Sequence, residues 1–288
     1  MRVLIPMVLA AFAAAQQDPV SPPKPTPAQG ELSEKEFAAL HELKKEAPPK
    51  PTGTMVKVGE AQHYLALPKD KQAPLPAVIV IHEWYGLNDH IKHWADRLAG
   101  EGYAALAVDL YRGTVAKTSD EAMATMKAVD AAQAKETLHD AFAFLTSDGR
   151  IKAKKRGCIG WCFGGGWSLK LAIAEPDLDA CVFYYGQPVD DEAELGKIQA
   201  PVLAVFGTKD RSISKEKVDA LEASMKKLGK DCRVLRYDAE HAFANPSGAR
   251  YDQKNAAAAW TEARAFLQQH LSGGKAENAS GKPAEKGK

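Results

Sequence analysis

The sequence lacks several features that would assign a protein to a functional class directly. Its 288 residues include 38 Lys and Arg against 37 Asp and Glu, so no excess of one charge favours nucleic acid as a partner. The four cysteines are not spaced from one another, or from histidines, as the ligands of a zinc site are. No internal repeat is visible, and no apolar run reaches the roughly 20 residues of a membrane span. We therefore expect no nucleic acid, no metal, no cofactor and no membrane span in the mature protein.

The first part of the chain differs from the rest in composition. Residues 1–15 have a short basic start, an apolar run and an Ala-x-Ala end, which predicts a signal peptide and a secreted or periplasmic protein. Residues 16–53 are rich in proline and predict an extended linker with one short amphipathic helix. The pattern Ser33-x-x-Glu36 is a capping box that opens this helix. We interpret the helix as a packing or spacer element, with partner binding as the alternative.

The middle of the chain alternates between strand and helix patterns. Two short strands, near 54–59 and 62–67, predict an antiparallel hairpin. Further strands are expected near 76–83, 103–109, 156–161, 181–185, 201–206 and 232–237, and helices near 88–99, 119–147, 163–175, 214–229 and 253–270. Such alternation predicts an α/β protein whose mostly parallel sheet is covered by helices on both faces. Residues 272–288 have no periodicity and predict a disordered tail, which leaves one domain over 54–271.

A glycine-rich motif stands where one of these strands turns into a helix. The segment Gly160-Trp161-Cys162-Phe163-Gly164 has the small-x-nucleophile-x-small spacing of a nucleophile elbow, with Cys162 in place of serine. A cysteine at a helix N-terminus meets backbone N–H groups and a helix dipole that favour its thiolate. The alternative is a turn that cradles a phosphate or only packs tightly, so other residues must decide between the two.

Two residues further along the chain match the expected partners of such a nucleophile. An α/β-hydrolase supplies nucleophile, acid and histidine in that order, and Asp210 and His241 follow Cys162 in this order. Each follows an expected strand, and the carboxyl ends of the strands of an open α/β sheet face one site. Taken singly, Asp210 is typical of a turn and His241 of a surface loop. Their order and placement together indicate the acid and the base of a catalytic site.

A further carboxylate is expected at the same edge of the sheet. Glu83 ends the apolar strand near 76–83, and in α/β-hydrolases the loop after this strand provides one backbone donor of the oxyanion hole. We assign the two donors to the N–H groups of Trp84 and Phe163. In the alternative interpretation Glu83 forms a salt bridge with a nearby side chain, for which the candidates are His82, His90 and Arg97.

Taken together, these motifs resemble the dienelactone hydrolase family over roughly residues 55–270. The matching segments are 81–86, 109–111, 160–165, 184–186, 207–210 and 241–243. The resemblance implies an α/β-hydrolase fold, the hydrolysis of an ester or lactone, and a Cys162–His241–Asp210 triad. It also implies that Glu83 activates the thiol: the resting cysteine is neutral, and bound substrate moves Glu83 so that it takes the thiol proton.

The substrate contacts of the family are not matched. In its name-giving enzyme, arginines hold the substrate carboxylate, and one of them stands four residues after the catalytic histidine, where this chain has Asn245. The other belongs to a helical region, and residues 114–136 here contain no arginine. Arg112 and Arg250 are possible replacements. The substrate contacts that we name are Tyr85, Tyr111 and Arg112.

The cysteines of an exported protein usually pair, but their placement here argues against it. Cys158 and Cys162 are expected on one strand, roughly 13 Å apart, whereas a disulfide spans at most about 7 Å between Cα atoms. Cys181 and Cys232 begin strands that should not be neighbours. We interpret Cys158, Cys181 and Cys232 as buried core residues.

The sequence therefore predicts an exported, monomeric α/β-hydrolase that cleaves an ester or lactone bond of a small molecule. Cys162 would attack the carbonyl carbon, His241 would move the protons, and Asp210 would hold the histidine tautomer. One alternative is a broad carboxylesterase or thioesterase with the same triad. The other is a non-catalytic binding protein on a hydrolase scaffold.

Overall fold

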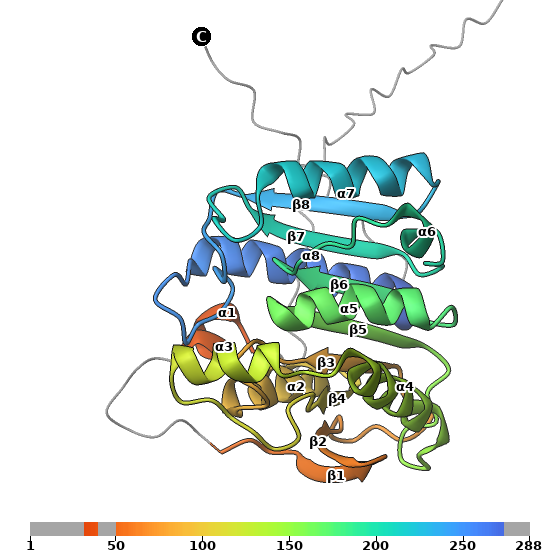
Figure 1. Cartoon of the computed structure of the whole chain (residues 1–288). Helices are drawn as coiled ribbons and strands as arrows, with labels where there is room; N and C mark the ends of the chain where they lie inside the picture. The colour runs from red at the N-terminus through yellow and green to blue at the C-terminus, as the bar shows by residue number, and fades with distance from the viewer. Residues whose placement is uncertain (1–31, 40–49, 274–288) are drawn as a thin grey trace, which may run out of the picture.

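The structure is a computed structural model that describes residues 32–39 and 50–273 (Figure 1). The expected signal peptide over 1–15, most of the expected linker, and the tail beyond residue 273 lie outside the described residues. No helix in the described part of the chain is long and apolar enough to cross a membrane.

One sheet forms the centre of the domain (Figure 1). Its strands are β1 (Thr54–Val58), β2 (Ala61–Ala66), β3 (Ala77–Ile81), β4 (Ala104–Val108), β5 (Arg156–Trp161), β6 (Ala180–Tyr184), β7 (Val202–Gly207) and β8 (Cys232–Tyr237). They lie in the order β1-β2-β4-β3-β5-β6-β7-β8. The β1–β2 hairpin and the β2–β4 pair are antiparallel, and the other pairs are parallel. The predicted hairpin and the mostly parallel sheet are therefore confirmed, and so is the α/β-hydrolase fold.

Helices cover both faces of this sheet (Figure 1). The helices are α1 (Glu34–Ala39), α2 (Asp89–Gly100), α3 (Ser119–Lys127), α4 (Ala131–Ser147), α5 (Phe163–Ala174), α6 (Glu192–Leu195), α7 (Lys215–Lys227) and α8 (Gln253–Leu271). Helices α2 and α8 pack on one face, with α1 against α8, while α4, α5 and α7 pack on the other. This two-sided cover explains why β3, β4, β6 and β7 are buried along their whole length.

The long helix expected over 119–147 is in fact two helices. The first ends at Lys127, and the second begins after Asp130, whose backbone is extended. The Asp130 carboxylate accepts a hydrogen bond from the Gln133 N–H at 2.9 Å, which satisfies one of the free donors at the start of α4. The helical periodicity continues across this break, so only the local cap distinguishes two helices from one. The short helix α6 was not expected from the sequence.

Candidate active site

The expected elbow forms at the junction of β5 and α5. Cys162 stands between the last residue of β5 and the first of α5, with φ of 53° and ψ of −115°. A residue other than glycine in this region of backbone space is strained, and such strain is commonly found at functional sites. The turn is tight because Gly164 faces the backbone at the end of β3: a Cβ there would overlap the carbonyl oxygen of Ile81.

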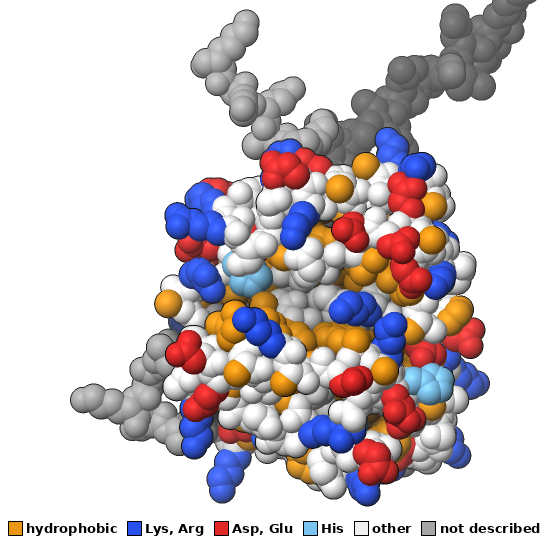
Figure 2. All heavy atoms as spheres, in the orientation of Figure 1, with side chains coloured by type: hydrophobic (Ala, Val, Ile, Leu, Met, Phe, Trp, Pro, Cys, Tyr) orange, Lys and Arg blue, Asp and Glu red, His pale blue; other side chains and the backbone are white. Residues whose placement is uncertain are grey.

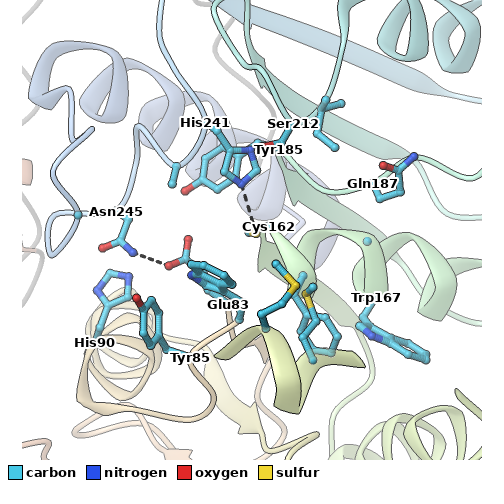
Figure 3. Close-up of a pocket in the computed structure, with 18 of the residues that line it drawn as sticks. Glu83, Tyr85, His90, Cys162, Trp167, Tyr185, Gln187, Ser212, His241 and Asn245 are labelled. Carbon is cyan, nitrogen blue, oxygen red and sulfur yellow. Dashed lines mark hydrogen bonds between the residues drawn. The ribbon is translucent and has the colours of Figure 1, made fainter. Parts of the chain in front are cut away.

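Cys162, His241 and Asp210 form a hydrogen-bonded chain, of which Figure 3 shows the contact between His241 and Cys162. The Cys162 Sγ lies 3.2 Å from His241 Nε2, and His241 Nδ1 lies 2.7 Å from Asp210 Oδ2. Asp210 is held in turn, because its other oxygen accepts hydrogen bonds from the N–H groups of Ser212 at 2.7 Å and Ile213 at 2.9 Å. The structure thus brings together three side chains that are far apart in the sequence, in the geometry of a nucleophile, its base and the residue that orients the base.

The charges of the base and the acid depend on this chain. Burial lowers the pKa of His241, but its hydrogen bonds with Asp210 and Cys162 outweigh burial and raise that pKa to about 10. Burial raises the pKa of Asp210, but the hydrogen bonds from His241 and from the Ile213 and Ser212 N–H groups bring it below its ordinary value. A charged Asp210 beside a positively charged His241 stabilises an imidazolium that can give a proton to a leaving oxygen.

Glu83 lies two residues beyond β3, in the same pocket (Figure 3). Its side chain is buried, and the Asn245 amide donates a hydrogen bond to one of its carboxylate oxygens. Burial is the main cause that raises the pKa of Glu83 to about 7. Arg97, one of the proposed salt-bridge partners, pairs with Glu34 instead at 3.0 Å. Another, His82, donates from Nδ1 to the Glu83 backbone oxygen at 2.6 Å and accepts the Leu110 N–H on Nε2.

The two assigned oxyanion donors lie at the rim of the elbow. Phe163 is the first residue of α5, and its N–H therefore has no partner inside the helix. Trp84 directly follows Glu83, and both Trp84 and Phe163 line the pocket that contains Cys162. Their placement in the loop after β3 and at the start of α5 suits a pair of N–H donors for one carbonyl oxygen.

A pocket of about 1360 Å³ opens above Cys162. This is larger than the roughly 300–1,000 Å³ of a typical small-molecule site. Figure 2 shows a hollow in this face of the molecule, with hydrophobic side chains inside and Lys and Arg side chains around it. Figure 3 shows Trp167 on one side of Cys162, with Asn245, Tyr85 and His90 on the other. The apolar side chains of its wall include Met123, Met126, Val129, Phe163 and Trp167.

Only one of the three expected substrate contacts lines the pocket. Tyr85 lines the pocket, with its hydroxyl 3.2 Å from the Ser119 hydroxyl. Tyr111 lies behind the site, where its ring packs 4.5 Å from His82 and 5.3 Å from Phe163. Arg112 is exposed, and the structure places neither Tyr111 nor Arg112 in the wall of this pocket. The other candidate arginine, Arg250, does line it.

Two residues at the site were not expected from the sequence. Asn245 was noted only as a departure from the family, yet it holds the Glu83 carboxylate. Tyr185 is fully buried with φ of 36°, and its ring centroid lies 5.1 Å from that of His241. The match at residues 184–186 is the sequence signal that could have identified Tyr185.

In the part of the chain that the structure describes, no group of three or more His, Cys, Asp or Glu side chains could hold a metal ion.

The fold is that of a hydrolase of the α/β class, and comparisons with known proteins agree. The model of the dienelactone hydrolase family matches residues 61–271. "Protein usf" of Aquifex pyrophilus is 34% identical over 72% of this chain and 93% of its own length. A protein of Aquifex aeolicus, provisionally named a carboxymethylenebutenolidase, is 31% identical over 72% of this chain and 93% of its own.

A solved structure supports the same relationship. A dienelactone hydrolase-like promiscuous phosphotriesterase from metagenomic libraries superposes with a TM-score of 0.71 and 28% sequence identity, over 76% of this chain and 98% of its own. The chain belongs to the dienelactone hydrolase family, as its motifs indicated. Membership of this family makes it a hydrolase that acts on ester or lactone bonds.

Proposed function

We propose that this protein is an exported hydrolase that cleaves an ester or lactone of a small molecule through Cys162, His241 and Asp210. The observation that carries the proposal is the position of His241, whose two ring nitrogens lie 3.2 Å from the Cys162 sulfur and 2.7 Å from the Asp210 carboxylate. One imidazole can therefore give a proton to the leaving oxygen and take one from water, while its orientation is held by the acid.

In the proposed mechanism Glu83 takes the thiol proton, the Cys162 sulfur attacks the carbonyl carbon, and a C–S bond forms. The negative charge on the carbonyl oxygen is stabilised by the N–H groups of Trp84 and Phe163. The intermediate collapses, the C–O bond breaks, and His241 gives its proton to the leaving oxygen. Water then attacks the thioester while His241 accepts one of its protons. The C–S bond breaks, the acid is released, and Glu83 returns its proton to the sulfur.

Glu83 is proposed to activate the thiol. Its buried carboxyl has its pKa raised to about 7 and lies in the same pocket as Cys162. A group with a pKa near neutrality is suited to accept and return a proton at physiological pH. In the structure the Cys162 thiol pairs with His241 and Glu83 pairs with Asn245, so activation requires that substrate releases Glu83 from the Asn245 amide.

The walls of the pocket support a preference for esters with one bulky apolar group. Apolar rings and thioethers line it at Trp167, Phe163, Met123 and Met126, and methionine adapts to varied shapes. Each methylene that is buried contributes about 0.8 kcal/mol. We therefore expect kcat/KM to rise with acyl chain length until the pocket is full.

The proposal is tested with aryl esters from acetate to octanoate and with small lactones. Cys162→Ala should abolish turnover of all of them, because it removes the nucleophile. Cys158→Ala is the matched control: this cysteine is fully buried in β5, so the variant should lose about 1 kcal/mol of stability and keep its activity. Equal loss of turnover in both variants, with both folded, would contradict the assignment of the nucleophile.

The same measurements separate the alternatives. Efficient turnover of aryl esters without turnover of lactones would favour the broad carboxylesterase, and thioester substrates would identify a thioesterase. Binding without turnover of any substrate by the wild-type protein would favour the non-catalytic scaffold. Export is tested separately, by locating the processed protein outside the cytoplasm of the cells that express it.

A further inference from the structure

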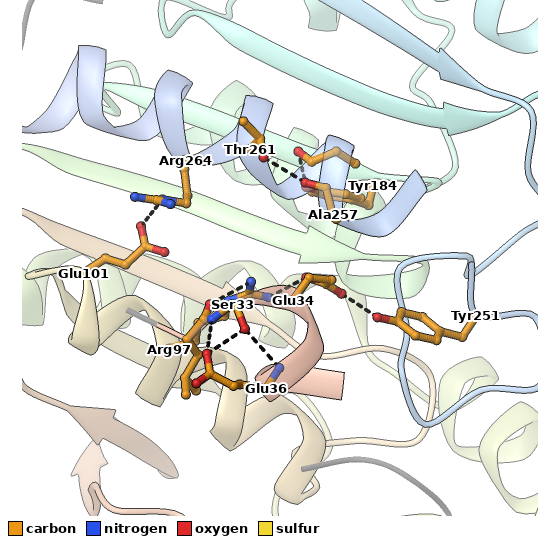
Figure 4. A network of polar contacts seen from close by, with 12 residues as sticks. Ser33, Glu34, Glu36, Arg97, Glu101, Tyr184, Tyr251, Ala257, Thr261 and Arg264 are labelled. Carbon is orange, nitrogen blue, oxygen red and sulfur yellow. Dashed lines mark hydrogen bonds and ion pairs between the residues drawn. The ribbon is translucent and has the colours of Figure 1, made fainter. Parts of the chain in front are cut away.

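Helix α1 lies before the residues that match the family, yet it is seated on the hydrolase domain (Figure 4). Phe37 is the buried residue of this helix, with an exposed fraction of 0%. Its ring packs 4.3 Å from that of Trp94 on α2, and the Arg97 guanidinium covers it at 4.4 Å. The helix is therefore part of the packed domain and not a free spacer.

Glu34 of the same helix joins two distant parts of the chain (Figure 4). Its Oε2 accepts a hydrogen bond from Arg97 at 3.0 Å, and its Oε1 accepts one from the Tyr251 hydroxyl at 2.8 Å. Arg97 is 1% exposed, and a buried charge of this kind is tolerated only when it is paired. Glu34 is consequently held in one position by its partner on α2 and presents its second oxygen to Tyr251.

Tyr251 ends the loop that follows the proposed catalytic histidine. This loop is closed at its base by a hydrogen bond from the Asp252 N–H to the Phe243 oxygen, at 2.9 Å. Between these two residues it carries Asn245, which holds Glu83, and Arg250, which lines the pocket. The hydrogen bond between Glu34 and Tyr251 therefore holds the end of the loop that follows His241, and this loop positions Glu83 through Asn245.

A second connection runs through aromatic rings. Trp94, against which Phe37 packs, stacks on Trp161 with ring centroids 4.5 Å apart. Trp161 is the last residue of β5 and directly precedes Cys162. Helix α1 is thus connected to both halves of the proposed site, to the elbow indirectly through Phe37, Trp94 and Trp161, and to the histidine loop through Glu34.

We propose that α1 is a built-in brace of the active site, in which Glu34 is a positioning residue that acts through Tyr251 on the loop after His241. This inference rests on the proposed function for its activity readout. Without the brace the loop would move, Asn245 would separate from Glu83, and His241 would sample positions farther from the Cys162 sulfur. Displacement of a catalytic group by about 1 Å can cost up to 10²-fold in rate.

The experiment compares Tyr251→Phe with the wild type in the full chain. This variant keeps the ring and removes only the hydroxyl that reaches Glu34. We expect kcat to fall about tenfold with little change in KM, since the pocket walls remain. The pH dependence of Cys162 alkylation by a neutral reagent should shift toward that of an unpaired thiol, and the amides of 243–252 should exchange faster. The matched control is Glu36→Gln, on the same helix but paired with Ser33 at the surface.

Two further results decide the inference. A Tyr251→Phe protein with wild-type kcat and an unchanged alkylation profile would overturn it. A loss of activity that matches the fraction of unfolded protein would also overturn it. Glu34→Gln tests this outcome, because it removes the carboxylate charge that pairs with Arg97 and should lower the melting temperature. Amide exchange needs no turnover, so a failure of the proposed hydrolysis would leave this readout intact and the two proposals distinguishable.

Discussion

At the scale of single residues, the protonation of Glu83 is the property that connects stability with the proposed chemistry. Burial raises its pKa from 4.5 to about 7, so the folded protein keeps a proton that the unfolded chain releases between these values. The stability that comes from keeping Glu83 neutral is therefore present at low pH and is lost as the pH rises through about 7. Asn245 donates its amide hydrogen to Glu83 and thereby favours the charged form, which opposes part of this loss.

Glu83→Gln should reveal both effects. The free energy of unfolding of the variant relative to the wild type should increase from pH 4.5 to 7, by roughly 1–3 kcal/mol, because only the wild type ionises a buried carboxyl. Turnover should fall by roughly 10²–10⁴, the range for a positioned proton acceptor. Chemical denaturation and steady-state kinetics across this pH range provide the measurements.

The control for this variant is Glu240→Gln, an exposed carboxylate next to His241 in the sequence. It should change neither the pH dependence of stability nor the rate. Near-wild-type turnover in Glu83→Gln would assign Glu83 a purely structural role and leave the cysteine triad without an activating carboxylate.

At the scale of elements, the site depends on how closely α5 approaches the sheet. The elbow turns in the space between β5 and the backbone that follows β3, and Gly164 faces that backbone without a side chain. Any side chain there would push the start of α5, and with it the N–H of Phe163, away from the site. The strained backbone of Cys162 is maintained by this packing.

Gly164→Ala should therefore destabilise the fold by about 1–3 kcal/mol through overpacking, and lower turnover as the elbow shifts. Gly166→Ala is the matched control for stability. It lies on the same helix, and a Cβ there would meet its nearest atom, the Gln187 oxygen, at 3.4 Å, which is an ordinary contact. That control should be neutral or gain up to about 1 kcal/mol of helix propensity. Equal urea midpoints for the two variants would show that the close approach is not a constraint.

At the scale of the whole molecule, the sheet order keeps Cys181 and Cys232 apart. Strand β7 lies between Cys181 and Cys232, so their Cα atoms are roughly 9.5 Å apart by strand spacing, beyond the reach of a disulfide. Cys158 and Cys181 face each other on neighbouring strands, and both thiols donate to the Ser168 oxygen, at 3.6 and 3.4 Å. All four cysteines are free.

Protein prepared by export should therefore titrate four thiols after denaturation without reductant. In the native state Cys162 should be alkylated first, because Cys158 and Cys181 are fully buried and Cys162 opens into the pocket. Peptide mapping by mass spectrometry identifies the labelled positions. A Cys181–Cys232 bridge in that map would contradict the strand order, and a Cys158–Cys181 bridge would show that the neighbouring thiols oxidise on export.

Much of the fold was determined by patterns that involve near neighbours in the chain. The strand positions and most helix positions follow from apolar periodicity. The capping box at Ser33 and Glu36 forms as expected, with the Glu36 N–H donating to Ser33 Oγ at 3.2 Å. The order of Cys162, Asp210 and His241 indicated a site because the ends of parallel strands meet at one edge. These features need no knowledge of which distant residues touch.

Contacts between distant residues were decided only by the tertiary structure. Arg112 was expected in the site and is exposed, while Asn245 and Arg250 reach the pocket because the loop after His241 folds over it. Nothing near Glu34 in the sequence indicates that it would join Arg97 and Tyr251. The helices and the order of the triad follow from short-range patterns, whereas the packing of α1 and of this loop depends on which surfaces meet when the sheet and its two layers assemble.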